Sequence, residues 1–212
     1  NVDGAGSKIL DGGSGTDALV INYSGISSLG DFTISESGDY TVLTYVNGDT
    51  IQFKNIESLT VGSYTYTNNT SANTFWNSSE YVIYMYSGGN VSAGDITAYS
   101  GFSKSADLSV FGSGSADSMN LNISRVSSGA LYEFTGNWTI SLGAGNDSIS
   151  SAKLKNADSI DMGAGDDTIS LMLTGSDGTN SIANASLAKL DGGAGWDTLS
   201  FYESGANTTA IS

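Results

Sequence analysis

Aspartates at fixed positions in glycine-rich turns are the residues of this chain with the clearest chemical potential. Two nine-residue segments, 12–20 and 192–200, follow the pattern G-G-x-G-x-D-x-U-x, in which U is a large aliphatic residue. The glycines allow tight turns and close approach of the backbone to an ion. The aspartate supplies a hard oxygen ligand, the kind that Ca²⁺ prefers. The aliphatic residue starts a short strand whose side chain points inward, so the pattern predicts calcium-binding turns between short strands.

Degenerate copies of the pattern follow the same logic. Segments 142–150 and 162–170 differ from it only at the first glycine, and 156–161 keeps the D-x-U half. Asp158 lies nine residues before Asp167 and eleven after Asp147. Because two nonapeptides make one turn of a roll, this spacing is close to one full turn with a small insertion. Segment 112–120 is a weaker match, and 3–11 carries Lys8 where the aspartate is expected, so turns without an ion remain the alternative there.

The candidate ligands are the aspartates and glycines of these turns, together with backbone carbonyls of the same loops. Asp117 stands alone in its degenerate copy, and the insert 174–189 is expected to interrupt the second ladder and so deprive Asp197 of a neighbouring turn. The candidates are Asp11, Gly13, Gly15, Asp17, Asp117, Gly143, Gly145, Asp147, Asp158, Asp161, Gly163, Gly165, Asp167, Asp191, Gly193, Gly195 and Asp197.

Composition excludes several classes of function. The chain has 212 residues, 22 acidic and 7 basic, and a net charge of −15, which disfavours binding to nucleic acid or insertion into anionic membranes. The absence of histidine and cysteine removes the usual zinc-hydrolase and nucleophile–histidine arrangements. The acids outside the repeats are scattered, so no catalysis is expected. Without disulfides, bound calcium is a plausible source of stability.

The pattern of apolar residues predicts an all-β fold, a parallel β-roll or β-solenoid with calcium-binding turns plus antiparallel hairpins. Residues 1–67 read as the end of one repeat block with hairpin closure, 68–140 as a connecting β-rich segment, and 141–212 as a second block, and the three could form one continuous solenoid. Asn47-Gly48 between apolar runs predicts a type I′ hairpin turn. No helix is predicted firmly: 183–190 is the only plausible short one, and it could equally be a loop.

The aromatic segment 75–86 has two interpretations. Its tryptophan and tyrosines, Trp76 and Tyr84 among them, could form a platform for a carbohydrate, since aromatic side chains with polar tips line many ligand sites. The alternative, which we favour, is a buried strand whose large residues fill a core that has no calcium loops.

The repeats resemble those of the RTX family, and the alternation of few calcium turns with longer β segments is most similar to bacterial S-layer proteins and large RTX adhesins. The resemblance implies export by type I secretion, folding on Ca²⁺ binding, and a role at the bacterial cell surface, where self-association in a lattice or other surface contacts are expected. The alternatives are a carbohydrate-binding module of an adhesin and the non-catalytic RTX portion of a secreted enzyme or toxin. Because the chain starts in mid-repeat, we expect it to be part of a longer polypeptide.

Overall fold

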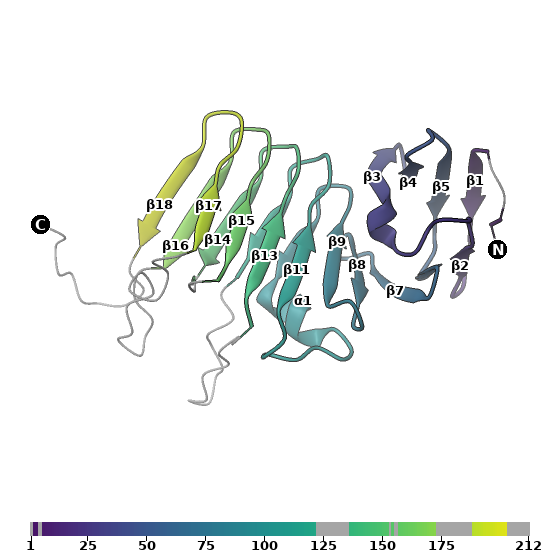
Figure 1. Cartoon of the computed structure of the whole chain (residues 1–212), viewed down its shortest axis with the longest axis horizontal. Coiled ribbons are helices and arrows are strands. Elements are labelled where there is room, and N and C mark those ends of the chain that lie inside the picture. The colour runs from purple at the N-terminus through teal and green to yellow at the C-terminus, as the bar shows by residue number, and fades with distance from the viewer. Residues whose placement is uncertain are drawn as a thin grey trace, which may run out of the picture.

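The computed structural model describes residues 2–3, 6–121, 136–152, 154, 157–172 and 188–202. In these residues the chain is almost entirely β-structure, arranged as three sheets along one elongated body (Figure 1). The predicted all-β class is therefore confirmed. In the same ranges, no helix is long and apolar enough to cross a membrane.

The largest sheet runs the length of the molecule in the order β17-β15-β13-β11-β9-β8-β7-β6-β2. The strands from β9 to β17 are parallel, those from β6 to β9 are antiparallel, and β2 is parallel to β6. The strands are β2 (Ala18–Ile21), β6 (Ser58–Val61), β7 (Tyr64–Asn69), β8 (Thr74–Asn77), β9 (Val82–Met85), β11 (Leu108–Phe111), β13 (Trp138–Ser141), β15 (Ser159–Asp161) and β17 (Lys189–Asp191).

A second, fully parallel sheet has the order β10-β12-β14-β16-β18. From β9 onward the chain alternates between the two sheets, so each passage through both advances the stack by one turn. Register aligns Ile149 with Ile169 and Ile169 with Leu199, which keeps the inward aliphatic residues in one row. Its strands are β10 (Asn90–Ser92), β12 (Ser118–Asn120), β14 (Ser148–Ala152), β16 (Thr168–Met172) and β18 (Thr198–Tyr202).

The third sheet, β1-β5-β4-β3, lies at the N-terminal end. It consists of β1 (Lys8–Asp11), β5 (Thr50–Lys54), β4 (Tyr40–Tyr45) and β3 (Phe32–Ser37), the last preceded by a 3₁₀ turn at Leu29–Asp31. The predicted β4–β5 hairpin is confirmed, but its turn is not type I′. Gly48 has φ +90 while Asn47 is not left-handed, and Tyr45 N–H donates to the Asp49 carbonyl. These features match a three-residue loop with a left-handed glycine at its end.

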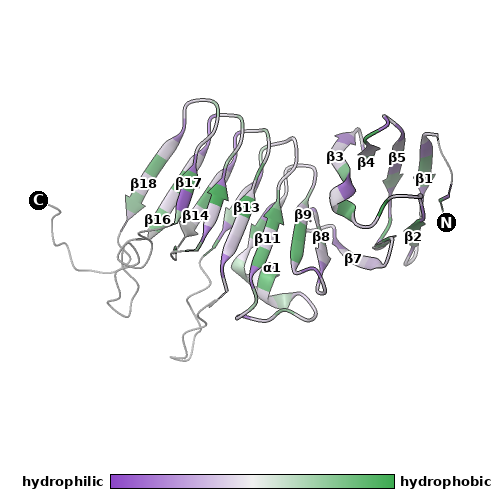
Figure 2. Cartoon of the chain, viewed as in Figure 1, coloured by the Kyte–Doolittle hydropathy of each residue, from purple (hydrophilic) through white to green (hydrophobic). Residues whose placement is uncertain are grey.

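Strand β9 separates two hydrophobic cores. Ile83 and Met85 pack with the second sheet, whereas Val82 and Tyr84 pack with the third. Because successive side chains of a strand point to opposite faces, the two smaller sheets cover opposite faces of the nine-stranded sheet. Hydrophobic residues recur along the strands on both ladders (Figure 2). Trp76 and Tyr84 are buried, as the favoured interpretation of the aromatic segment predicted.

One sheet crosses all three segments predicted from the sequence, which were also allowed to form one continuous solenoid. The nine-stranded sheet contains strands from 1–67, 68–140 and 141–212 alike, and the change of core falls at β8–β9. The insert 174–189 was expected to interrupt the ladder, but β17 pairs with β15 and β18 with β16. The register of the two ladders is therefore kept after the insert.

The segment 183–190, for which a short helix and a loop were equal alternatives, is not helical in its described residues. Lys189 and Leu190 belong to β17, and the rest of 183–190 lies outside the described residues except Ala188, which is in neither helix nor strand. The chain instead forms α1 (Ala93–Ala98). Ser92 and Asp95 form a capping box at its start, a signal that satisfies two backbone N–H groups and that the sequence reading had overlooked.

Stacking of the turns requires glycine at particular positions. Gly163 has φ +97, and a Cβ there would lie 1.8 Å from the Gly143 carbonyl oxygen of the preceding turn. Gly13 has a similar φ of +83, but a Cβ there would meet nothing within 4 Å. Both glycines have a left-handed backbone, but only Gly163 lies in close contact with the backbone of the preceding turn.

Gly163→Ala should therefore destabilise the chain more than Gly13→Ala. Both variants incur the left-handed conformation, about 1 kcal/mol, and only Gly163→Ala adds an overlap costing about 1–3 kcal/mol. Urea unfolding in calcium, followed by circular dichroism, measures both. Equal losses in the two variants would show that the turns are not held in close contact.

Candidate cation site in the stacked glycine turns

The site is built from the turns that follow the strands of the large sheet and precede those of the second sheet, the row of loops at the top of Figure 1. Their backbones are joined directly. Gly145 N–H donates to the Ala164 carbonyl and Ala164 N–H to the Gly143 carbonyl, each at 2.8 Å. Gly165, Ala194 and Gly163 repeat this pattern one turn later. The successive loops are therefore stacked as closely as strands in a sheet.

Local sequence explains the shared shape of these loops. The second and fourth positions of the pattern are left-handed glycines in every well-matched copy, and only glycine adopts this conformation without cost. The pairs are Gly13 and Gly15, Gly143 and Gly145, Gly163 and Gly165, and Gly193 and Gly195. The repeat thus sets the loop conformation even at 12–17, where the neighbouring turn is different.

The aspartates of the stacked turns form a column. Asp147 accepts a hydrogen bond through Oδ1 from the N–H of Asp117, and Asp167 accepts one from the N–H of Asp147, both at 2.7 Å. Asp197 accepts one from the N–H of Asp167 at 3.1 Å. Each carboxylate therefore reaches back by one turn. Asp197 has its neighbouring turn, and Asp117 is not isolated, contrary to both expectations.

Two oxygens of the column lack a partner. The Oδ2 atoms of Asp147 and Asp167 are buried and have no hydrogen-bond donor within the described part of the chain. These residues are 2% and 1% exposed. Burial raises the pKa of Asp147 to about 6, and the charges of Asp117 and Asp167 add to this, against the hydrogen bond from Asp117 N–H. A buried carboxylate oxygen without donors is costly, and a bound cation removes that cost.

Asp117, at the start of the column, is satisfied by protein groups alone. Ser113 and Ser115 occupy the two positions where the other copies have left-handed glycines. The Ser113 N–H and the Gly89 N–H donate to the carboxylate of Asp117, both at 2.6 Å, and the Ser113 hydroxyl donates as well. Burial raises the pKa of Asp117, and these hydrogen bonds oppose the rise. Its turn closes the column without needing an ion.

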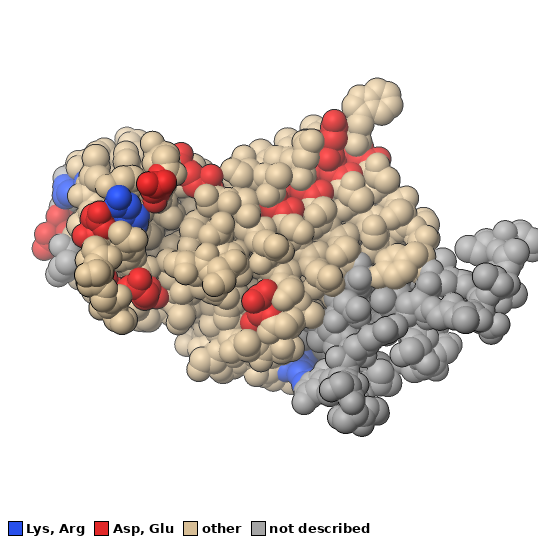
Figure 3. Space-filling model, turned by 180° about the vertical axis from the view of Figure 1, so that it is seen from behind, with Lys and Arg blue, Asp and Glu red and all other residues tan. Residues whose placement is uncertain are grey.

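The structure separates the remaining candidates from the column. Asp158 lies just before β15, at the opposite end of the strands from the column, where it is buried and accepts a hydrogen bond from Trp138 N–H at 2.8 Å. Asp161 and Asp191 are exposed at the ends of β15 and β17, paired in register. Asp191 accepts from Gly193 N–H at 3.1 Å. Seen from behind, the molecule presents a row of acidic side chains across its upper part (Figure 3).

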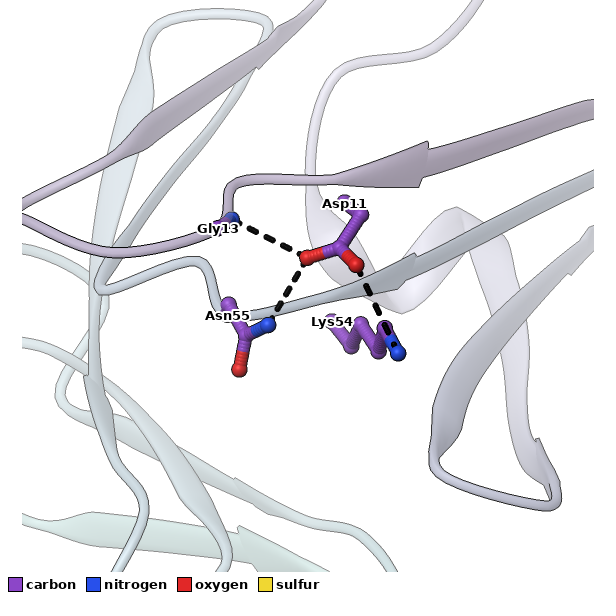
Figure 4. A network of polar contacts seen from close by, with 4 residues as sticks. All are labelled: Asp11, Gly13, Lys54 and Asn55. Carbon is purple, nitrogen blue, oxygen red and sulfur yellow. Dashed lines mark hydrogen bonds and ion pairs between the residues drawn. The ribbon is translucent and has the colours of Figure 1, made fainter.

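The N-terminal copy stacks on a turn of different sequence. Asp17 N–H donates to the Glu57 carboxylate at 2.7 Å. Glu57 therefore accepts the hydrogen bond that, in the column, the aspartate of the next turn accepts. Asp11 accepts hydrogen bonds from Gly13 N–H at 3.0 Å and from the Asn55 amide at 2.7 Å, and it pairs with Lys54 at 3.4 Å (Figure 4). The Asn55 hydrogen bond, above all, lowers the pKa of Asp11. The carboxylate of Asp11 is thus already bonded by protein groups.

Glu57 was missed as a site residue, although the segment Asn55-Ile56-Glu57 after an apolar strand was a visible signal. Within the described ranges no three His, Cys, Asp or Glu side chains lie close enough to enclose a metal by themselves. A cation in the column would therefore need backbone carbonyls of the loops beside the aspartates, which suits Ca²⁺. Comparison with protein-family models and with curated protein sequences finds no match.

Replacing single aspartates by asparagine should distinguish the two kinds of position. Without metal, Asp147→Asn removes a buried charge beside Asp117 and Asp167 and should raise the melting temperature. Asp117→Asn places an NH₂ group against the N–H donor of either Ser113 or Gly89 and should lower it. Each effect is expected to be about 1 kcal/mol, or roughly 2–4 °C.

Differential scanning calorimetry in EDTA measures both shifts. Destabilisation by Asp147→Asn as large as that by Asp117→Asn would mean that the Asp147 carboxylate is satisfied in the metal-free chain. The orphaned oxygen would then give no reason for a cation to bind there.

Proposed function

We propose that this chain is a calcium-stabilised structural module of a secreted bacterial cell-surface protein, an S-layer or RTX adhesin, whose alternating parallel ladders are a β-roll. The observation that carries the proposal is the pair of buried, donorless oxygens of Asp147 and Asp167 inside stacked glycine turns. A cation between these loops would convert the repulsion of neighbouring carboxylates into attraction. Extracellular modules of this kind bind Ca²⁺ at about 10⁻⁴ to 10⁻³ M.

Coupling of folding to calcium follows from the same column. Because the ligands come from successive turns, the site does not exist in the unfolded chain, and the free energy of binding becomes free energy of folding. At low cytosolic calcium the C-terminal ladder would be loosened, and it would become ordered after export. The N-terminal end has its own aromatic core, with Phe53 and Phe75 in contact, and should persist without metal.

A non-catalytic role is supported by the hydrogen bonds that three glutamates accept from other parts of the fold. Glu36 accepts hydrogen bonds from Ser87 N–H and the Ser115 hydroxyl. Glu57 accepts from Asp17 N–H, and Glu80 accepts from the Tyr66 hydroxyl. Each therefore joins parts of the fold instead of facing a substrate. Glu133 and Glu203 lie outside the described residues.

Two alternatives remain from the sequence. A carbohydrate platform at Trp76 and Tyr84 is not supported, since both side chains are buried. The non-catalytic RTX portion of a secreted enzyme or toxin would contain the same calcium ladder, and the residues that flank the chain in its parent protein would distinguish it from a lattice module.

Calorimetric titration of EDTA-treated protein should show calcium uptake, with one ion for each of the orphaned oxygens of Asp147 and Asp167. Circular dichroism should report a gain of β-structure in parallel. Asp167→Asn should lose an ion. Asp11→Asn is the matched control and should keep the stoichiometry, because Lys54 and Asn55 already hold that carboxylate. A flat titration at millimolar calcium would exclude the proposal.

The surface role generates a second prediction. Among the described residues, β17 and β18 each have one unpaired edge, and exposed edges invite pairing with other chains. These two strands and the turn between them also present large apolar side chains, including Trp196 in the turn at 88% exposure. These are Leu190, Trp196, Leu199 and Phe201.

Calcium should therefore promote ordered assembly of the protein, and Phe201→Lys should reduce it by placing a charge at the edge. Val46→Lys, which changes an even more exposed apolar residue in the β4–β5 turn, should leave it unchanged. Electron microscopy and sedimentation with and without calcium measure assembly. A protein that stays monomeric in calcium would contradict the lattice role while leaving the calcium site intact.

A further inference from the structure

A second site of different chemistry lies in the N-terminal part of the molecule, away from the aspartate column. A cavity of about 410 Å³ opens between the loop after β2 and the turn of the β4–β5 hairpin. This volume falls within the range of roughly 300–1,000 Å³ that small-molecule sites occupy. We call it the tyrosine cup. Its lining residues are Asn22, Tyr23, Ser24, Phe32, Tyr45, Asn47, Asp49 and Ile51.

The cup has an apolar base and a polar rim. Phe32 and Ile51 are buried and belong to the N-terminal core, whereas Tyr23 and Tyr45 are partly exposed. The Phe32 and Tyr45 rings lie 5.9 Å apart at 55°, which fixes the orientation of Tyr45. The Tyr45 hydroxyl has no hydrogen-bond partner among the residues that the structure describes. A fixed aromatic ring with a free hydroxyl is a group able to contact a ligand by both its face and its tip.

Asp49 is held in place on the rim. Its Oδ2 accepts hydrogen bonds from Gly6 N–H at 3.0 Å and from the Asn47 amide at 2.9 Å. The Gly6 hydrogen bond is the main reason why the pKa of Asp49 is lowered, so the carboxylate is ionised near neutral pH. No described donor reaches its other oxygen, which remains able to accept from a ligand hydroxyl. Asn47 is in turn fixed by Asp49 N–H at 2.9 Å.

These groups specify the chemistry of the occupant. The aromatic faces favour an apolar C–H surface, while the carboxylate, amides and hydroxyls require several neutral donors and acceptors around its edge. No lysine or arginine lines the cup, and Asp49 together with the net charge of −15 repels anions. A neutral pyranose ring has this combination of properties. We propose that the tyrosine cup binds one ring of a neutral saccharide.

The other depression of this region is less suited to a ligand. It has a volume of about 480 Å³ beside β3, β4, β5 and β7, but its polar groups are already bonded to one another. Asn68 bonds Tyr86 and the Ile56 carbonyl, and the Asn73 amide bonds the Ser87 carbonyl. Lys54 covers the ring of Tyr40 at 4.9 Å. Tyr40 therefore serves as a matched aromatic control for Tyr45.

The saccharide site is independent of the calcium ladder, because its residues belong to the N-terminal core. Saturation-transfer NMR tests it with the 212-residue chain in calcium and methyl glycosides of glucose, galactose, mannose and N-acetylglucosamine, with methyl glucuronide as the anionic probe. At least one neutral glycoside should receive saturation on one ring face, and the glucuronide should receive none. The absence of transfer to all four neutral glycosides would overturn the proposal.

Variants locate the binding. Tyr45→Ala should weaken the affinity for the positive glycoside about tenfold, the change that about 1.4 kcal/mol of lost contact produces. Ser24→Trp fills the cup from an exposed loop position, avoids the core, and should abolish binding even if Tyr45→Ala fails to fold. Tyr40→Ala should leave the affinity unchanged. Binding that survives Ser24→Trp, or that is lost in Tyr40→Ala instead, would place the ligand elsewhere and refute the proposal.

Discussion

The close contact of successive glycine turns is the constraint on which the C-terminal half of the structure depends. Backbone hydrogen bonds of 2.8 Å join loops one turn apart, and a Cβ on Gly163 or Gly193 would lie 1.8 Å from the carbonyl of the preceding turn. Loops this close bring their aspartates into a single column, whether or not their charges repel. The fold thereby creates an electrostatic problem at the same positions where it creates a possible cation site.

The chain resolves that problem in different ways along its length. At Asp117 a serine replaces the left-handed glycine, and its hydroxyl and N–H satisfy the carboxylate. In the N-terminal copy the longer Glu57 reaches the Asp17 N–H, and Asp11 is bound by Lys54 and Asn55. Beyond Asp117, toward the C-terminus, the buried Oδ2 atoms of Asp147 and Asp167 have no donor among the described residues. The proposed dependence on calcium is therefore concentrated in the middle and C-terminal turns of the ladder.

The two halves of the molecule are joined through one sheet and stabilised differently. β9 contributes alternate side chains to both cores, and Glu36 links β3 to Ser115 in the first turn of the aspartate column. The N-terminal core contains several aromatic rings in contact, so it can hold a preformed cup such as that of Tyr23 and Tyr45. The C-terminal ladder instead aligns aliphatic residues such as Ile149 and Ile169 in one row.

The sequence by itself determined the local features: the all-β class, the β4–β5 hairpin, the burial of the aromatic segment, and the left-handed loop conformation of each good repeat. These depend on side-chain alternation and on glycine, which act within a few residues. Only the tertiary structure decided which aspartates meet. Asp147 and Asp167, twenty residues apart, share a column. Asp158 lies at the opposite end of the strands, because the chain runs along β14 between Asp147 and Asp158. The roles of Glu57 and Ser113, and the cup formed by Tyr23 and Tyr45, likewise depend on segments that pairing between strands brings together, which the spacing of residues along the chain does not reveal.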